Sequence, residues 1–489
     1  MKRKIVSILF SALAMVLSTN AFAFCGFYVA KADSKLFNNK SEVILVRDGK
    51  QTVITMSNDY QGPMRDFAMV IPVPVVIQKD DIKVVDRRVF EVLDAYSAPR
   101  LVEYWDQNPC TPVYDYNLCF SDAVETTSMM KSEMMNEDES LDYGVKIEAR
   151  YSVGEYDILV LSATESSGLK NWLLLNGYKI PEAAEQVLEP YIKSNTKFFV
   201  AKVNLDNAST GFDYLRPLQI SFEHDKFMLP IRLGMANSQG EQDMIIYGFT
   251  RSGRIECTNY RTVKTPTDRN IPLYTQAKFG DFYKNLFDKA YQREGRNAVF
   301  LEYAWNVSPF NAVKCDPCVG NPPFNQDFVD AGIPWLNDKV QNPTMFFTRL
   351  HVRYGRNKFP SDLQFQVTPN NENFQCRYIL THPASGEFDC DEGQMYLDDL
   401  YFRRKKEVDE FFALTGKHDQ QSYTYMNEYV KHMKVKPDLL VEPKRNEVLV
   451  MLPELPSGGR PGAMLIALGF TLAIVWFGMV KSQRGLDHA

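Results

Sequence analysis

Alternating apolar and polar residues predict β-strands in the first part of the chain. The strand-like runs cover residues 24–31, 41–49, 50–57 and 66–77. A side-chain period of two places one face of each run in a core. Asp48-Gly49, between the second and third runs, predicts a hairpin turn. Pro72 and Pro74 cannot donate to a strand ladder, so we expect the fourth strand to lie at a sheet edge or to leave the sheet.

The same pattern continues through the rest of the chain, interrupted by helical periods. Residues 145–163 predict a second hairpin, and 165–176 and 182–194 predict a pair of helices, with Gly177 and Pro181 as stop and start signals. Further strands are predicted at 197–205, 217–225, 227–235, 244–250, 298–306, 346–354 and 373–382, and helices near 279–291 and at 392–415. The predicted fold class is therefore α+β, predominantly antiparallel, with several helices and one C-terminal transmembrane helix.

A run of basic residues lies inside the last of these predicted helices. It covers residues 403–406, and Glu407 and Glu410 follow within a turn. Opposite charges at this helical spacing form surface ion pairs. We therefore expect the run to form a solvated helix face.

Both ends of the chain carry targeting signals. Residues 1–23 begin with three basic residues, continue with an apolar run and end in Ala21-Phe22-Ala23, the pattern of a secretory signal peptide. Lipidation of Cys25 is an alternative that the bulky Phe24 disfavours. Near the other end, residues 462–480 are nineteen residues without a charge, long enough to cross a bilayer as a helix.

The charges around this apolar segment predict its orientation. Lys481 and Arg484 follow it, whereas Arg460 alone precedes it, so residues 481–489 are expected in the cytoplasm and the body outside. The Pro- and Gly-containing stretch 446–461 is expected to be a stalk. The alternative is a sorting signal whose helix is cleaved rather than retained. The sequence thus predicts an exported, single-pass membrane protein of the bacterial cell envelope or periplasm.

The charge balance excludes one class of partner. The chain has 55 Lys and Arg and 61 Asp and Glu, and three of the basic residues lie in the signal peptide, which leaves a mature net charge of −9. An acidic body of this kind is not expected to bind nucleic acid or an anionic membrane surface. Residues 121–143, acidic and poor in aromatic residues, are expected to form a mobile surface insert.

Length and pattern together suggest three segments between the signal peptide and the stalk. We expect an N-terminal β-rich domain at 24–165, an α+β domain at 166–300 and a C-terminal α+β region at 301–445.

The eight cysteines are the main candidates for covalent chemistry. They are Cys25, Cys110, Cys119, Cys257, Cys315, Cys318, Cys376 and Cys390. Export leads to an oxidising compartment, so all eight are first of all disulfide candidates. Locally, Cys110 with Cys119 and Cys376 with Cys390 would each close a short loop.

Cys315 and Cys318 form a Cys-Asp-Pro-Cys motif that allows three interpretations. A thiol-disulfide oxidoreductase places the first cysteine at a helix start, which lowers its pKa. Here Gly320, Pro322 and Pro323 follow and disfavour such a helix. A tetrathiolate zinc site with Cys376 and Cys390 is weakened by the wide spacing of the second pair. Structural disulfides, within the motif or to distant partners, are the third and favoured interpretation.

Motifs for other enzyme classes are missing from the sequence. It contains no HExxH, GxSxG or Walker loop, and His351 alternates with apolar neighbours as a strand-face residue would. A hydrolase whose site is dispersed along the chain stays open, because triad residues meet only in space. We expect no cofactor or metal and no catalytic residue, and we favour a protein that is not an enzyme.

Several blocks of sequence resemble a known bacterial family. The blocks are CGFYVAKADSKLFN at 25–38, TMSNDYQGPMRDFAMVIPVP at 55–74, LDAYSAPRLVEYWDQNPC at 93–110, the CDPC motif and FFTRLHVRY. In this order they are similar to the exported family known as domain of unknown function 2330. The resemblance implies an exported bacterial protein and no established activity or catalytic residues. The leading hypothesis is therefore a membrane-anchored envelope protein that binds or scaffolds, with a possible envelope protein partner.

Overall fold

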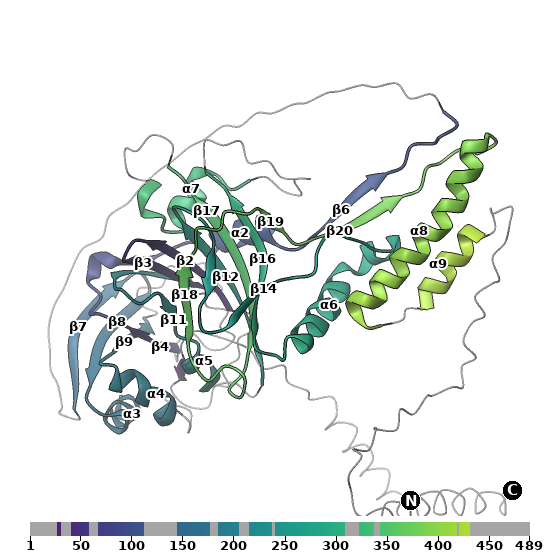
Figure 1. Cartoon of the computed structure of the whole chain (residues 1–489). Helices are drawn as coiled ribbons and strands as arrows, with labels where there is room; N and C mark the ends of the chain where they lie inside the picture. The colour runs from purple at the N-terminus through teal and green to yellow at the C-terminus, as the bar shows by residue number, and fades with distance from the viewer. Residues whose placement is uncertain are drawn as a thin grey trace, which may run out of the picture. The chain divides into compact units, whose positions relative to one another are not determined.

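The computed structural model describes ten stretches of the chain (Figure 1). They are residues 27–30, 41–57, 67–111, 144–176, 184–204, 215–236, 240–308, 322–336, 343–417 and 420–430. The chain divides into two units, Met1–Pro437 and Asp438–Ala489, and every described residue belongs to the first. The predicted signal peptide, acidic insert, stalk and membrane segment lie outside these stretches. Within them, no helix is long and apolar enough to cross a membrane.

A nine-stranded sheet is the largest element of the described fold. Its strands run in the order β14-β16-β17-β12-β2-β3-β10-β5, and β19 pairs with β16. These are β2 (Ser41–Asp48), β3 (Gln51–Ser57), β5 (Ile82–Val84), β10 (Leu218–Glu223), β12 (Gln242–Thr250), β14 (Arg261–Lys264), β16 (Ala298–Asn306), β17 (Phe346–Tyr354) and β19 (Phe374–Gln375). Central strands such as β12 and β16 are buried along nearly their whole length. Two hydrophobic clusters cover the two faces of this sheet.

Three smaller sheets complete the β-structure of the described residues. The five-stranded sheet has the order β1 (Phe27–Ala30), β4 (Phe67–Val73), β9 (Lys197–Val203), β8 (Tyr156–Ala163) and β7 (Val145–Val153). A second sheet has the order β11 (Met228–Leu229), β18 (Leu363–Val367) and β13 (Ile255–Cys257). The third has the order β15 (Arg269–Asn270), β20 (Arg377–His382) and β6 (Arg100–Trp105). Most pairings are antiparallel, whereas β12–β2, β14–β16, β15–β20 and β20–β6 are parallel.

Both predicted hairpins are present. Strands β2 and β3 pair in antiparallel fashion around Gly49, and β7 and β8 do so around Gly154. Both glycines have φ near +55°, which other residues adopt at a cost, so the turns require them. The edge prediction for the strand with Pro72 was wrong for the strand as a whole, because β4 lies between β1 and β9. Among the described residues the pairing with β1 ends at Val70, and Pro72 pairs with Phe198 of β9.

Eight α-helices lie within the described residues. They are α2 (Arg88–Ser97), α3 (Ser166–Leu175), α4 (Ala184–Lys193), α5 (Arg232–Ala236), α6 (Phe279–Arg293), α7 (Asn325–Asp330), α8 (Asp391–Thr415) and α9 (Gln420–Val430). Short 3-10 turns occur at Lys79–Asp81, Leu273–Lys278 and Pro334–Leu336. The α+β class is thus confirmed. The predicted strand at 227–235 was wrong, since only β11 and then α5 occupy it; Pro230 between them cannot continue a ladder.

The predicted segment boundaries do not separate these sheets. The nine-stranded sheet takes β2 and β3 from the first segment, β10 and β12 from the second, and β17 from the third. The boundary between residues 300 and 301 falls inside β16. Strands of this one sheet therefore come from all three predicted segments, and the division into segments stays a prediction.

The basic run in α8 is not the solvated face that the sequence predicted. Arg404 is fully buried, and its guanidinium donates to both carboxylate oxygens of Glu407, at 2.9 and 2.8 Å. Tyr425 of α9 donates to the same carboxylate. Helix α9 covers this face of α8 (Figure 1), so the pair lies between the two helices. Lys405 does remain at the surface, paired with Asp409.

A buried glutamate lies at the centre of a charged ladder on β16 and β17. The register of these strands shifts between Leu301 and Tyr303, and Glu302 sits in this bulge. A bulge re-aims a side chain, and here the carboxylate points at the side chains of β17. Arg349 donates to it at 2.6 Å and His351 contacts it at 2.9 Å. Tyr283 of α6 donates to the same carboxylate.

The ladder continues in both directions from this carboxylate. Towards one side, Arg349 donates to Asp94 of α2 at 2.7 Å. Towards the other, His351 contacts Asp243 of β12 at 3.1 Å, and Arg353 donates to both oxygens of Asp243. Arg349, His351 and Arg353 share one face of β17 because alternate residues point the same way. The ladder thus links α2, α6 and three adjacent strands.

Burial and charge act in opposite directions on the ladder's pKa values. Burial by itself raises the pKa of Glu302, but His351 and Arg349 outweigh it and lower this pKa to about 2. Burial by itself lowers the pKa of His351, but the carboxylates of Glu302 and Asp243 raise it above its usual value. With both ring nitrogens on carboxylates, His351 is held as the cation.

These shifts predict how stability depends on pH. A raised histidine pKa contributes stability that is complete below about pH 6.5 and is lost as the pH rises through the folded-state pKa. The lowered pKa of Glu302 contributes stability above about pH 4.3, which is lost as the pH falls towards 2. His351→Gln should therefore lower the free energy of unfolding most at pH 5–6, by about 1.5–3 kcal/mol per charged hydrogen bond lost, and less at pH 9.

Urea unfolding of the full chain in detergent at several pH values measures this difference. His224→Gln is the matched control, because the Nδ1 of His224 accepts from a backbone N–H rather than binding a carboxylate. If the loss of unfolding free energy in His351→Gln stays constant from pH 5 to 9, the assignment of a positive charge to His351 is contradicted.

Candidate functional site: a pocket where three sheets meet

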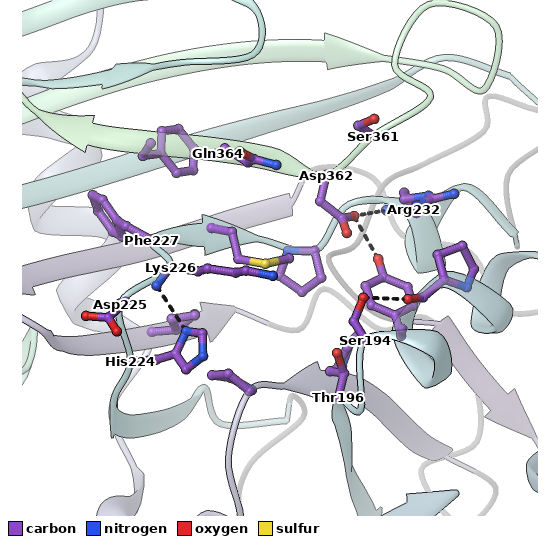
Figure 2. A pocket seen from close by; sticks show the side chains of 18 of the residues that line it. Ser194, Thr196, His224, Asp225, Lys226, Phe227, Arg232, Ser361, Asp362 and Gln364 are labelled. Carbon is purple, nitrogen blue, oxygen red and sulfur yellow. Dashed lines mark hydrogen bonds between the residues drawn. The ribbon is translucent and has the colours of Figure 1, made fainter. Parts of the chain in front are cut away.

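A pocket of about 480 Å³ lies where three of the sheets come together (Figure 2). The nine-stranded sheet contributes Ile54 of β3 and Phe222 of β10 to its lining. The five-stranded sheet contributes Pro72 of β4, and the β11-β18-β13 sheet contributes Phe365 of β18. This volume is within the range of small-molecule sites, which are concave, mostly apolar and contain a few convergent polar groups.

The pocket wall combines apolar and polar side chains in similar number. Its apolar part includes Ile54, Pro72, Pro74, Pro190, Phe222, Phe227, Met228, Pro230 and Phe365. Its polar part includes Ser194, Thr196, His224, Asp225, Lys226, Arg232, Thr258, Ser361, Asp362 and Gln364, together with the hydroxyl of Tyr191.

Asp362 is the buried acid of the pocket. It directly precedes β18 and is 9% exposed. Its Oδ1 accepts from the Tyr191 hydroxyl at 2.7 Å and from the backbone N–H groups of Ile231 and Arg232 at 3.0 and 3.1 Å. These bonds join α4 and the start of α5 to the beginning of β18. Burial raises the pKa of the Asp362 carboxyl above its usual value, although the hydrogen bonds and the charge of Arg232 oppose this.

The loop between β10 and β11 forms the facing wall. Figure 2 shows His224 and Lys226 on one side of the pocket and Asp362, Ser194 and Thr196 on the other. The Nδ1 of His224 accepts from the backbone N–H of Lys226 at 3.0 Å. The neutral ring therefore carries its proton on Nε2, where it can donate to a ligand.

A buried arginine holds this loop in place. Arg47 donates to the backbone oxygens of Lys50, His224 and Asp225 and to the hydroxyl of Thr52. Its guanidinium also lies over the ring of Phe227, 5.2 Å from the centroid. At the surface, Lys50 and Asp225 pair at 2.7 Å. The loop is thus fixed from behind, which keeps the positions of His224 and Lys226 defined.

None of the pocket residues was predicted from sequence. They come from positions 54 to 365 and from strands of three sheets, so no local motif joins them. The one weak signal is Asp362 after Pro360-Ser361, a polar residue at a strand start, which is common in any protein.

The structure describes four of the eight candidate cysteines. Cys110 and Cys390 form a disulfide with a Cα–Cα distance of 5.7 Å, across 280 residues of sequence. Both predicted local pairings were therefore wrong. Cys390 is also the N-cap of α8, where its sulfur accepts from the Gly393 N–H, and Cys110 follows β6. The pairing of β6 with β20 brings these distant parts together.

The remaining described cysteines are not bonded. Cys257 and Cys376 are free and buried, and burial raises both thiol pKa values. The predicted disulfide candidacy of these two was therefore wrong in this structure. A buried thiol with a raised pKa is a poor nucleophile.

The Cys-Asp-Pro-Cys motif cannot be judged in the same way. Cys25, Cys119, Cys315 and Cys318 lie outside the described residues. A tetrathiolate site with Cys390 is contradicted, because that sulfur is in the disulfide. The described stretches contain no group of three His, Cys, Asp or Glu arranged to hold a metal ion.

Comparison with known families shows to which family the chain belongs. The model of the family described as "Uncharacterized protein conserved in bacteria (DUF2330)" matches residues 19–366, well over half of the chain. The chain belongs to this family. The DUF2330 match contains every residue of the pocket and ends before α8 and Cys390. Searches of curated proteins and of solved structures returned no match.

The disulfide leads to a prediction about stability. Cys390→Ser removes the bond but keeps a good helix cap, because serine oxygen accepts from a backbone N–H. We expect the free energy of unfolding to fall by about 2–5 kcal/mol, as for other native disulfides. Chemical denaturation of the full chain in detergent measures this loss.

The same bond supplies its own control. The double variant Cys110→Ser/Cys390→Ser should be about as stable as the single one, since one bond is lost in both. A reducing agent should lower the free energy of unfolding of the wild type by more than that of the double variant. Alkylation of both thiols in the unreduced wild type would show that the bond does not form.

Proposed function

We propose that this protein is held in the bacterial cell envelope by its C-terminal segment and that its extracytoplasmic body binds a small molecule or short peptide. The single observation that carries the binding function is the pocket at the junction of three sheets. Membership of the DUF2330 family is compatible with this proposal and assigns no activity.

The location rests on the two ends of the sequence. The Ala21-Phe22-Ala23 cleavage pattern predicts export, and the uncharged residues 462–480 predict an anchor. The disulfide between Cys110 and Cys390 agrees with this location, since such bonds persist in oxidising compartments.

The binding function rests on the construction of the pocket. Its polar groups come from separate elements, yet their backbones are fixed by buried hydrogen bonds at Asp362 and Arg47. A preorganised site of this kind binds without a large cost for ordering its side chains. No contact within the described residues favours the thiol oxidoreductase or the hydrolase, and both stay predictions.

The proposed location predicts a simple fractionation result. Full-length protein expressed in a bacterium should sediment with membranes, and its body should be digested by protease added to spheroplasts. Deletion of residues 462–489 should move the body to the soluble periplasmic fraction. A body protected from external protease would contradict export, and a mature C-terminus that lacks the apolar segment would favour the sorting-signal alternative.

The proposed binding predicts that a bulky side chain in the pocket displaces the ligand. Ser194 lines the pocket at the end of α4 and is exposed, so Ser194→Trp should fill space without disturbing the core. Mass spectrometry of natively purified wild type should detect a bound small molecule that the variant lacks. A ligand at a hundred times its dissociation constant should stabilise the wild type by about 2.7 kcal/mol.

Ser385→Trp serves as the matched control, because Ser385 is exposed and lies outside the pocket. It should retain the ligand. A molecule retained equally by Ser194→Trp would place binding elsewhere, and the absence of any bound or stabilising molecule from the wild type would contradict the proposed function.

A further inference from the structure

The two facing walls of the pocket differ in charge. Asp362 supplies a carboxylate on one wall, and Lys226 supplies an ammonium group on the other (Figure 2). Two further ionised groups line the pocket: Asp225 is already paired with Lys50, and Arg232 lies close enough to Asp362 for its charge to act on that carboxylate. A ligand in the pocket therefore meets a negative and a positive group on opposite sides.

One oxygen of Asp362 is left for a ligand. All three donors among the described residues reach Oδ1, and none reaches Oδ2. Arg232 contacts the carboxylate through its backbone N–H and forms no ion pair with it in this part of the chain. A carboxylate that is 9% exposed and lines a cavity is costly unless its charge is balanced.

The structural role of this residue does not by itself require an acid. An asparagine side-chain oxygen could accept the same three bonds from Tyr191, Ile231 and Arg232. Among the described residues, the second oxygen is therefore the feature of this carboxylate that the fold leaves unused. An ammonium group of a ligand would supply a charged donor in direct contact with this oxygen.

The facing wall is suited to the opposite kind of group. Lys226 is exposed, and no ion pair with another described residue holds its ammonium group. The Nε2–H of His224, on the same side, is a second donor because Nδ1 is occupied by the Lys226 N–H. Two donors on one wall, one of them charged, fit a carboxylate.

Rigid apolar groups form a large part of the lining between the walls. Four prolines, at 72, 74, 190 and 230, border it, together with Phe227 and Phe365. Proline side chains cannot rearrange to hydrogen-bond a polar ligand. The middle of the ligand should therefore be apolar.

Resting on the proposed binding function, we propose that the ligand is a zwitterion with an apolar body: a free apolar amino acid or a dipeptide. Its ammonium group contacts Asp362 Oδ2, its carboxylate contacts Lys226 and His224, and its side chains pack against the prolines and Phe365. The same arrangement excludes nucleotides and sugars, which lack this pair of opposite charges.

Isothermal titration of the full chain in detergent tests this assignment. The probes are L-leucine and Leu-Leu, with N-acetyl-L-leucine lacking the positive charge and L-leucinamide lacking the negative one. At least one zwitterion should bind, and the two analogues of leucine should bind about 10- to 100-fold more weakly, the usual range for a lost charged hydrogen bond. Whether leucine or Leu-Leu binds more tightly distinguishes the amino acid from the dipeptide.

Two variants assign the two ends separately. Asp362→Asn keeps the acceptor of the structural bonds. It should weaken binding of the zwitterion about tenfold or more and leave the affinity for N-acetyl-L-leucine unchanged. Lys226→Met should weaken binding of the zwitterion and leave the affinity for L-leucinamide unchanged. Lys83→Met, an exposed lysine outside the pocket, is the matched control and should change nothing. Thermal unfolding confirms that each variant is folded.

The outcomes separate this inference from the function on which it rests. If N-acetyl-L-leucine binds as tightly as leucine, or if only uncharged molecules displace the native ligand, the zwitterion assignment is overturned and the pocket remains a binding site. If Asp362→Asn weakens binding of every probe equally, the residue acts only on the fold. This result also overturns the zwitterion assignment. If no molecule binds that Ser194→Trp excludes, both proposals fail.

Discussion

The negative charge of Glu302 is the constraint around which much of the described fold is arranged. A carboxylate 1% exposed is unstable in a protein interior unless charged and hydrogen-bonding partners surround it. The bulge in β16 turns Glu302 towards β17, where Arg349 and His351 meet it. Each of these partners then needs a second acid, and α2 and β12 provide Asp94 and Asp243. One buried charge is thus connected to three adjacent strands and two helices, α2 and α6.

The same sheet positions the pocket on its other side. β3 and β10, which supply Ile54 and Phe222, belong to the sheet that carries the ladder. The loop after β10 leads to the β11-β18-β13 sheet, where Asp362 directly precedes β18. Rigidity in the large sheet and buried hydrogen bonds at Asp362 and Arg47 give the pocket a defined shape. Among the described residues, Oδ2 of Asp362 and the ammonium group of Lys226 take no part in the hydrogen bonds that hold the walls together, and these groups can face a ligand.

Local patterns in the sequence were most accurate where a strand or helix is specified by its own residues. The predicted strands at 298–306 and 346–354 coincide with β16 and β17, and the hairpin at Asp48-Gly49 is present. The predictions failed where a distant partner changes the meaning of a residue. Arg404 looks like a surface charge in its own helix, and only α9 makes it buried. Cys390 looks closest to Cys376 in sequence, and only the pairing of β20 with β6 brings it to Cys110.

The sequence by itself determined the α+β class, the positions of most strands, the likeness to the DUF2330 family and the expectation of export. These depend on side-chain periodicity, turn residues and terminal signals, which are read from neighbours along the chain. The tertiary structure alone decided the disulfide partner, the charged ladder and the pocket. Each of these joins side chains from several sheets or helices. Local sequence patterns do not specify which distant elements come into contact.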